Sequence, residues 1–177
     1  MNLTKNFEKN ISGTASWSKV YIGLGSNLGD REKNIKTALE LLKEEKTINL
    51  LRASAISETD PEENLNQPKF LNAVCETQTS LSPVDLLDKL KKIEYKVGRP
   101  KEYEKNSPRI IDLDILVFDD LLLKGRTLII PHPKMHKRYF VLNGLNELAP
   151  DLLVPGHKKS VKQLLSELLD DIYASNQ

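Results

Sequence analysis

Residues 108–118, PRIIDLDILVF, are the stretch on which the predicted fold depends. Their second half gathers Ile, Leu, Val and Phe in a short run between Pro108 and Asp119, which predicts a buried β-strand. Because side chains alternate between the two faces of a strand, Asp112 and Asp114 lie on one face, about 7 Å apart, and Leu113 points to the other. Two carboxylates are unusual on a buried strand, so this face is a candidate functional site.

The two aspartates predict a cation opposite them. Like charges on one face repel each other and lose hydration, so a positive partner is expected. Magnesium fits, because it prefers oxygen ligands and is usually bound by one or two carboxylates together with substrate phosphates. Arg109, just before the strand, adds a planar guanidinium that matches phosphate oxygens. From this stretch alone a simpler alternative stays open, in which Asp112 and Asp114 occupy the solvated face of an edge strand.

Length and composition describe one ordinary domain. The chain has 177 residues, of which 39% are hydrophobic and 29% charged, and its net charge of +1 indicates no general attraction to nucleic acid or to a membrane. Cys75 is the only cysteine, which excludes an internal disulfide and favours a cytoplasmic location. No apolar run approaches the ~20 residues of a membrane span. Residues 1–18 are polar and predict a flexible extension, which leaves residues 19–177 as the domain.

Strand and helix signals alternate along the chain. The first half of the chain predicts a strand at 19–23, a glycine-rich turn at 24–30, a helix with Ile35, Leu39 and Leu42 on its apolar stripe, and a β-type run at 48–57. A polar loop at 58–69, a strand at 70–77, a helix between Ser82 and Gly98 and a basic loop up to Arg109 follow and lead to the strand within 108–118. The remainder predicts a hairpin turning at Gly125, a helix at 140–148 and a final helix capped by Ser160. The order βαββαβ predicts an α+β, ferredoxin-like sandwich, with helices on one face of an antiparallel sheet and with an appended hairpin and C-terminal helices.

Three separate motifs, taken together, resemble one family. They are YIGLGSNLG at residues 21–29, PRIIDLDI at residues 108–115, and IPHP at residues 130–133 followed by Arg138. The family is 6-hydroxymethyl-7,8-dihydropterin pyrophosphokinase of folate biosynthesis, and the resemblance runs from about Val20 to Gly156. It implies an ATP- and magnesium-dependent enzyme in which the pterin hydroxymethyl oxygen attacks the β-phosphorus of ATP, so that a pyrophosphoryl group is transferred and AMP leaves.

The resemblance also implies roles for individual residues. Asp112 and Asp114 would hold two magnesium ions, and Arg99 and Arg109 would grip the phosphates as part of the catalytic set. Further contacts to ATP are implied for Ile115, His132 and Arg138. For the pterin, the implied residues are Phe70 and Phe140, which would stack on the two ring faces, and Thr59 and Asn72, which would hydrogen-bond its polar edge.

The sequence departs from the family pattern at Asp60, Lys101 and Asn106, which affects loop closure and affinity more than chemistry. Two other functions compete with the pyrophosphokinase. One is a non-catalytic ferredoxin-like module that binds nucleic acid or protein on its sheet, although Asp112 and Asp114 would repel a phosphate backbone there. The other is an ATP- and magnesium-dependent enzyme with a different acceptor. We expect small-molecule substrates, a monomer, and neither nucleic acid nor membrane as a partner.

Overall fold

One antiparallel sheet forms the centre of the molecule. The structure is a computed structural model that describes residues 16–61, 66–102 and 107–175. Its sheet contains β1 (Ser18–Ser26), β2 (Ile48–Ala53), β3 (Ser57–Thr59), β4 (Phe70–Thr79) and β5 (Asp112–Phe118). The strand order is β2-β4-β1-β5, with β3 also paired to β4 and every pairing antiparallel. This order and the intervening helices confirm the predicted ferredoxin-like βαββαβ arrangement.

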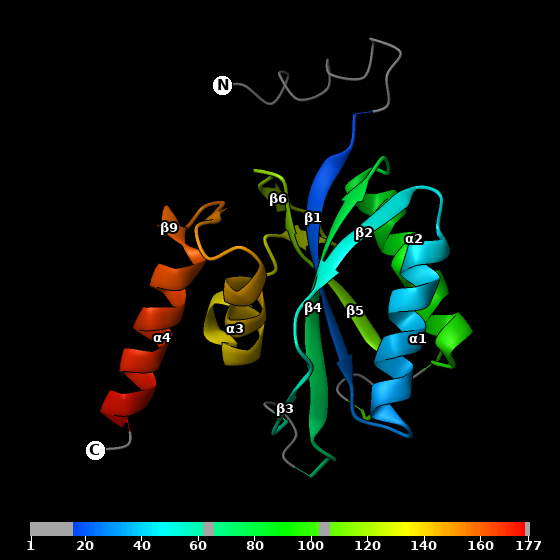
Figure 1. Ribbon diagram of the computed structural model, residues 1–177, viewed down its shortest axis with the longest axis horizontal. Coiled ribbons are helices and arrows are strands. Elements are labelled where there is room, and N and C mark those ends of the chain that lie inside the picture. Colours follow the sequence, from blue (N-terminus) through cyan, green and yellow to red (C-terminus); the bar gives the residue numbers. More distant parts are fainter. Residues whose placement is uncertain (1–15, 62–65, 103–106, 176–177) are drawn as a thin grey trace.

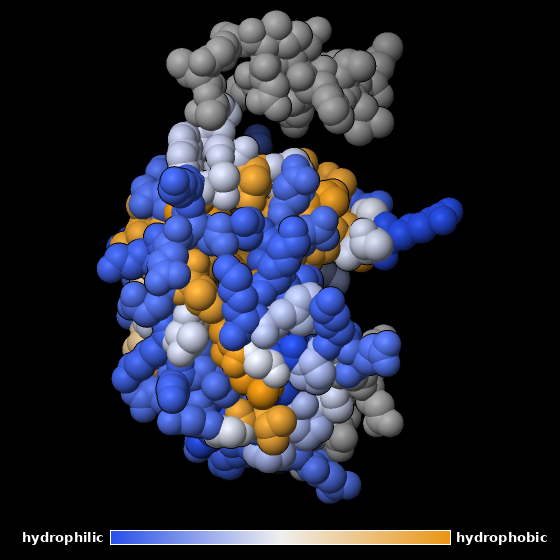
Figure 2. All heavy atoms as spheres, turned by 90° about the vertical axis from the view of Figure 1, so that its right-hand side faces the viewer, coloured by the Kyte–Doolittle hydropathy of each residue, from blue (hydrophilic) through white to orange (hydrophobic). Residues whose placement is uncertain are grey.

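Helices α1 (Arg31–Glu44) and α2 (Pro83–Val97) cover one face of the sheet (Figure 1). Both helices begin at a side-chain cap: the side chain of Asp30 accepts the Lys33 amide at 3.1 Å, and that of Ser82 accepts the Asp85 amide at 3.2 Å. The outer surface on this side is mostly hydrophilic, with a narrow apolar band across it (Figure 2). The apolar stripes of both helices therefore face the sheet.

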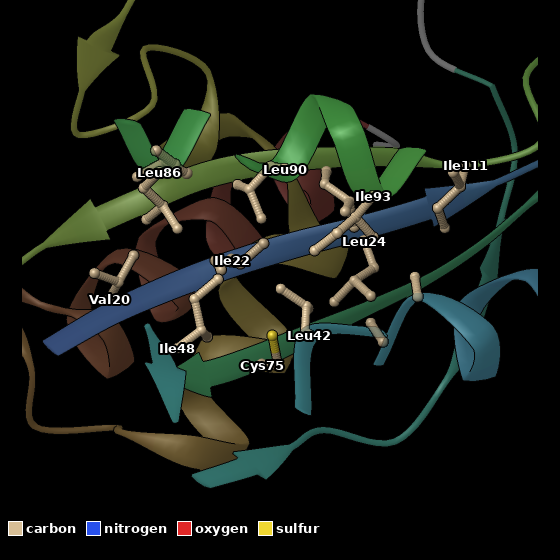
Figure 3. Close-up of a cluster of buried hydrophobic side chains, with 14 of the residues drawn as sticks. Val20, Ile22, Leu24, Leu42, Ile48, Cys75, Leu86, Leu90, Ile93 and Ile111 are labelled. Carbon is tan, nitrogen blue, oxygen red and sulfur yellow. The ribbon is translucent and has the colours of Figure 1, made fainter. Parts of the chain in front are cut away.

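The core on this face is densely packed and surrounds Cys75 (Figure 3). It combines Ile22 of β1 and Leu113 of β5 with Leu42 of α1 and Leu90 of α2, all fully buried. Each strand residue here alternates with a neighbour on the other face, as the pleat requires. The sheet therefore needs a second cover.

The second cover is formed by α3 (Tyr139–Leu148) and α4 (Val161–Ser175), which lie on the opposite side of the sheet from α1 and α2 (Figure 1). The two helices of the βαββαβ unit lie on one face as predicted, and the appended C-terminal pair, for which no face was predicted, covers the other. The physical reason is that Tyr21, Val74 and Leu116 also point away from α1 and α2, and they are buried with the apolar side chains of α3 and α4. Both faces of the sheet are apolar over most of their area, and both are covered.

Several short elements complete the chain. The predicted hairpin at Gly125 is confirmed as β6 (Leu123–Lys124) paired with β7 (Ile129–Ile130). A second small hairpin, β8 (Leu153–Val154) with β9 (Lys159–Ser160), and the 3-10 helix η2 (Met135–Lys137) were not predicted. Of the predicted N-terminal extension only residues 16–18 are described, and Ser18 already belongs to β1.

The predicted glycine-rich turn is shorter than expected. Strand β1 continues through Gly25 and Ser26, which pair with Asn72 and Leu71 of β4. Gly25 also pairs with Asp112 of β5, so it lies in the middle of the sheet. Among the described residues no helix is long and apolar enough to cross a membrane.

Candidate active site

A cavity of about 1000 Å³ opens on the α3 side of the sheet. Its floor includes Gly23 and Gly25 of β1 and Leu116 of β5, and Phe140 of α3 contributes to its lining. Most of the predicted site residues line this one cavity: Thr59, Phe70, Asn72, Arg99, Arg109, Asp112, Asp114, His132, Arg138 and Phe140. Residues from four strands, two helices and their loops thus meet at one end of the sheet. Asp60 and Lys101 also line it, and Asn106 lies outside the described residues.

Ile115 is the one predicted site residue that does not line the cavity. Its side chain is buried in the core with Leu113, on the α1 and α2 side of the sheet. The alternation that brings Asp112 and Asp114 to the cavity face sends Ile115 to the other face. The side chain of Ile115 therefore does not reach the cavity, and a contact of Ile115 to ATP, which the resemblance implies, would come from its main chain and stays a prediction.

Asp112 lies between two arginines. Its Oδ1 accepts a hydrogen bond from Arg99 Nη1 at 2.6 Å, and its Oδ2 accepts one from Arg109 Nη1 at 2.9 Å. Burial alone would raise the pKa of Asp112, but the positive charges of Arg109, Lys91 and Arg99 outweigh it and hold the pKa below its usual value. Asp112 is therefore ionised and anchors the arginines at the cavity wall.

Asp114 lies in a different environment on the same strand face. Its side chain is 40% exposed, and its Oδ2 lies 4.0 Å from His132 Nε2. Burial in the cavity and then the charge of Asp112 raise the pKa of Asp114 to about 6. A raised carboxylate pKa means that local positive charge does not fully compensate this aspartate, which is the condition under which a bound cation is favoured.

His132 faces this carboxylate as a neutral ring. Burial and then the positive charge of Arg138 lower the pKa of His132 to about 4. The Lys134 amide donates to Nδ1 at 3.2 Å, so Nδ1 is the acceptor and Nε2 carries the proton. The cavity side of His132 thus presents a hydrogen-bond donor to an anionic ligand.

Glu94 and Lys91, both on α2, belong to this site and were not predicted. Glu94 is 1% exposed; its Oε2 accepts from Arg99 Nη1 at 2.8 Å, and its Oε1 accepts from Lys91 Nζ at 2.7 Å and from the Leu113 amide at 2.8 Å. Burial raises the pKa of Glu94, and Lys91 opposes that rise. The sequence did contain a signal, because Glu94 continues the buried stripe of Leu86 and Leu90 at four-residue spacing.

The part of the cavity that is lined by phenylalanine rings is called its flat end, and the guanidinium carbons of Arg109 and Arg138 lie 5.5 Å and 5.9 Å from the Phe70 and Phe140 ring centroids. Phe70 and Asn72 of β4 and Phe140 of α3 line it, and Asn72 Nδ2 donates to Thr59 Oγ1 at 2.8 Å. Gly25 lies beneath them: a Cβ atom there would approach Asn72 Oδ1 to 3.1 Å. The bare backbone at Gly25 keeps the sheet open for a flat ligand.

Magnesium suits the donor set at the charged end. Asp112 and Asp114 provide hard carboxylate oxygens on one face, and each carboxylate offers about four lone-pair sites, so Asp112 can bind an ion while it also accepts from arginine. In residues 16–61, 66–102 and 107–175 there is no group of three or more His, Cys, Asp or Glu side chains placed to hold a metal. Two carboxylates completed by phosphate oxygens and water are the usual magnesium arrangement in nucleotide sites.

The strand order and the cavity, where an acidic pair lies between arginines, define an α+β protein with a ferredoxin-like sheet and a charged cavity on one face of it. The chain belongs to the 7,8-dihydro-6-hydroxymethylpterin-pyrophosphokinase (HPPK) family, whose model matches residues 21–150. This confirms the family resemblance that the three motifs indicate.

Named relatives agree with this membership. The chain is 43% identical to the 2-amino-4-hydroxy-6-hydroxymethyldihydropteridine pyrophosphokinase of Bacillus subtilis over 128 residues, which are 72% of this chain and 76% of the relative. It is 41% identical to the protein of the same name from Aquifex aeolicus, covering 84% of this chain and 91% of the relative.

Larger proteins contain the same domain. The folic acid synthesis protein fol1 of Schizosaccharomyces pombe is 40% identical over 84% of this chain, but the chain spans only 20% of that protein. An HPPK-DHPS crystal structure from Plasmodium falciparum superposes with a TM-score of 0.73 at 16% identity and covers 93% of this chain and 48% of that one. At this identity the structural match supports the fold alone.

Proposed function

We propose that this chain transfers a pyrophosphoryl group from ATP to the hydroxymethyl group of 6-hydroxymethyl-7,8-dihydropterin and releases AMP, as a step of folate synthesis. The observation that carries the proposal is the position of Arg109. Its Nη1 donates to Asp112 at 2.9 Å, and its guanidinium carbon lies 5.5 Å from the centroid of the Phe70 ring. Arg109 therefore lies where a metal-bound polyphosphate at the aspartates would meet a ring stacked on Phe70.

The phosphate end has donors suited to a polyanion. Arg109 Nε is buried and has no hydrogen-bond partner among the described residues, which leaves a donor for a phosphate oxygen. Arg99 and Arg109 supply fixed positive charge, and His132 Nε2 and Arg138 extend the donor surface along the cavity. Positioning and charge neutralisation of this kind account for most of the catalysis of phosphoryl transfer.

Asp112 and Asp114 would hold the magnesium, as two ions, and the metal would neutralise charge on the triphosphate. This assignment rests on the carboxylate pair and on the raised pKa of Asp114, which indicates incomplete compensation by the protein itself. The acidic pair also argues against a nucleic-acid-binding module, because it would repel a phosphate backbone on the sheet face that such modules use.

The pterin would occupy the flat end. Phe70 and Phe140 offer two aromatic faces, and the Asn72 amide, already oriented by Thr59, offers donor and acceptor groups for the polar edge of the ring. In the reaction the hydroxymethyl oxygen forms a bond to the β-phosphorus, the bond from that phosphorus to the oxygen shared with the α-phosphate breaks, and the hydroxyl proton is released. The protein contributes alignment of the two ligands.

An assay for AMP tests the proposal. The protein is incubated with ATP, magnesium and 6-hydroxymethyl-7,8-dihydropterin, and nucleotide products are separated by chromatography. AMP formed only when the pterin is present is the expected result. ADP would identify an ordinary kinase, AMP with other alcohols would change the acceptor, and neither product would favour a binding module.

We also propose that the protein acts as a monomer in the cytoplasm. The single cysteine supports the location, because Cys75 is a buried thiol rather than a disulfide. Size-exclusion chromatography with light scattering, repeated with ATP, magnesium and the pterin, tests the oligomeric state. A mass of about twice 20.1 kDa under either condition would contradict the monomer.

A further inference from the structure

Six charged side chains form one connected group at the charged end of the cavity. The three anions are Glu94, Asp112 and Asp114, and the three cations are Lys91, Arg99 and Arg109. Arg99 Nη1 bridges Glu94 Oε2 at 2.8 Å and Asp112 Oδ1 at 2.6 Å. Lys91 Nζ lies 2.7 Å from Glu94 Oε1 and 3.9 Å from Asp112 Oδ1. The same two cations thus contact both the buried glutamate and the aspartate at the cavity.

Glu94 determines how much positive charge remains for Asp112. Lys91 and Arg99 contact Glu94 at hydrogen-bond distance. Glu94 and Arg99 are almost fully buried, and buried charges interact more strongly than charges in water. Without the glutamate, Lys91 and Arg99 would have only the aspartates as anionic partners within this group. With Arg138, whose charge also acts on Asp114, four cations would then face two aspartates, and a divalent cation would be repelled.

We propose that Glu94 is a positioning residue for metal binding: it neutralises Lys91 and Arg99, so that Asp112 and Asp114 keep enough negative charge to take a divalent cation. The inference rests on the proposed function, since it assigns the metal to the aspartate pair. It adds a residue one layer behind the cavity, which acts through its neighbours and does not contact the ion. Glu94 also holds the start of β5 through the Leu113 amide, so a test must separate charge from structure.

The test uses substitutions with opposite expected signs. Mn²⁺ replaces Mg²⁺ as a paramagnetic probe, and its affinity for the protein without nucleotide is measured by electron paramagnetic resonance. Glu94→Gln, which removes a negative charge with little change in shape, should weaken Mn²⁺ binding by on the order of tenfold or more. Lys91→Met, which removes a positive charge, should tighten it about threefold or more.

Two further variants sharpen the measurement. The double variant Glu94→Gln with Lys91→Met removes one anion and one cation and so keeps the net charge of the native group, so its Mn²⁺ affinity should return toward the native value. Glu45→Gln is the matched control. Glu45, at the end of α1, accepts at 2.8 Å from Lys89 of α2, the helix that also carries Glu94, but it does not line the cavity. This control should bind Mn²⁺ like the native protein.

Structural damage would weaken binding in both single variants, whereas charge balance requires opposite shifts. Native-like binding by Glu94→Gln, unchanged or weaker binding by Lys91→Met, or no Mn²⁺ binding by the native protein at millimolar concentration would each overturn the inference. If circular dichroism shows that Glu94→Gln is unfolded, Lys91→Met and the double variant still decide it. The AMP assay is independent of this test. If the native protein forms AMP but the variants do not change Mn²⁺ affinity, only the inference is refuted. If the two single variants shift Mn²⁺ affinity in opposite directions but the native protein forms no AMP, only the proposed function is refuted.

Discussion

The two faces of the sheet receive side chains from the same strands, yet only one of them contains the site. Toward α1 and α2, Cys75 of β4 and Leu113 of β5 are fully buried among apolar neighbours. Toward α3, Asp112, the residue next to Leu113, and Asn72, three residues before Cys75 on β4, line the cavity of about 1000 Å³. One residue along a strand thus separates the packed core from the candidate chemistry.

The difference lies in how far the helices extend over each face. The cluster around Tyr21 and Val74 under α3 and α4 is as well buried as the cluster on the opposite face. Beyond it, the glycines of β1 and the polar residues of β4 and β5 are left facing the cavity. The open face therefore combines a packed half, which fixes α3 and with it Phe140, and an uncovered half, which binds ligands.

The largest expected effect comes from removing a carboxylate from the open face. Asp114→Asn should abolish pyrophosphoryl transfer, because it removes a magnesium ligand while keeping the shape of the side chain. Folding should be unchanged or slightly improved, since the repulsion from Asp112 disappears. AMP formation at saturating magnesium measures the first effect and urea unfolding the second. Asp120→Asn, in the exposed turn after β5, is the control, and near-native turnover by Asp114→Asn would refute the metal assignment.

A smaller loss is expected from an arginine on the same face. Arg109→Ala should lower kcat by on the order of 10² to 10³, as is typical for one lost contact to developing charge in a transition state. Steady-state kinetics with varied ATP measures this loss. Arg126→Ala, in the exposed hairpin, should behave like the native protein. A rise in the KM for ATP with unchanged kcat would show instead that Arg109 binds substrate and transition state equally.

The flat end can be closed by a single methyl group. Gly25→Ala places a Cβ atom 3.1 Å from Asn72 Oδ1, so the amide must move and the floor of the slot rises. We expect about tenfold weaker pterin binding, since one methyl group in a pocket typically changes affinity by roughly 10- to 200-fold. Calorimetric titration with the pterin and with a non-hydrolysable ATP analogue separates the two ends of the cavity.

Gly23→Ala provides a matched control on the same strand. Its Cβ atom would meet only Leu116 at an ordinary distance of 3.4 Å. The affinity for the pterin should therefore fall less than in Gly25→Ala, and the affinity for the nucleotide should be unchanged in both variants. Equal losses in the two variants, or a loss confined to the nucleotide, would show that the slot does not lie over Gly25.

The packed half of the open face should respond through stability. Gly144 of α3 lies so close to β4 that a Cβ atom would be 2.7 Å from Val74 Cγ2. Alanine normally favours a helix over glycine by about 1 kcal/mol, but overpacking typically costs about 1–3 kcal/mol, so Gly144→Ala should lower the free energy of unfolding. Urea denaturation measures it. Adding Val74→Ala should recover part of the loss, and stabilisation by Gly144→Ala alone would contradict this close packing.

Much of this architecture follows from local patterns in the sequence. Alternation at Asp112, Leu113 and Asp114 assigned the faces of β5 correctly, and the helix predicted between Ser82 and Gly98 is confirmed as α2. The same alternation turns the Ile115 side chain away from the cavity, so the contact to ATP that the family resemblance implies for Ile115 would come from its main chain.

Other features depend on contacts distant in sequence. Gly25 and Ser26 look like part of a turn, but pairing with β4 keeps them in the sheet. The apolar stripes of α3 and α4 show that these helices pack, without showing against which face of the sheet. The four-residue spacing of Leu86, Leu90 and Glu94 indicates that Glu94 is buried, but its contacts to Arg99 and Lys91, which connect it to the site, depend on the folded structure.

The smallest expected effect tests the closed face at its centre. Cys75 is fully buried between β1 and the two helices, with Ile22, Leu42 and Ile48 around it (Figure 3). Burial raises the pKa of the Cys75 thiol to about 12, so the reactive thiolate is scarce at neutral pH and the sulfur is inaccessible to reagents.

Iodoacetamide should therefore leave the folded protein unmodified and its AMP formation unchanged, whereas the same reagent in guanidinium should modify one cysteine per chain, as mass spectrometry would show. Because Cys75 is fully buried, labelling should require unfolding, and its rate should rise with urea as the unfolded fraction rises. Rapid labelling in the absence of denaturant, with native circular dichroism, would mean that α1 or α2 detaches from the sheet on its own, and the contrast between a closed and an open face would then fail.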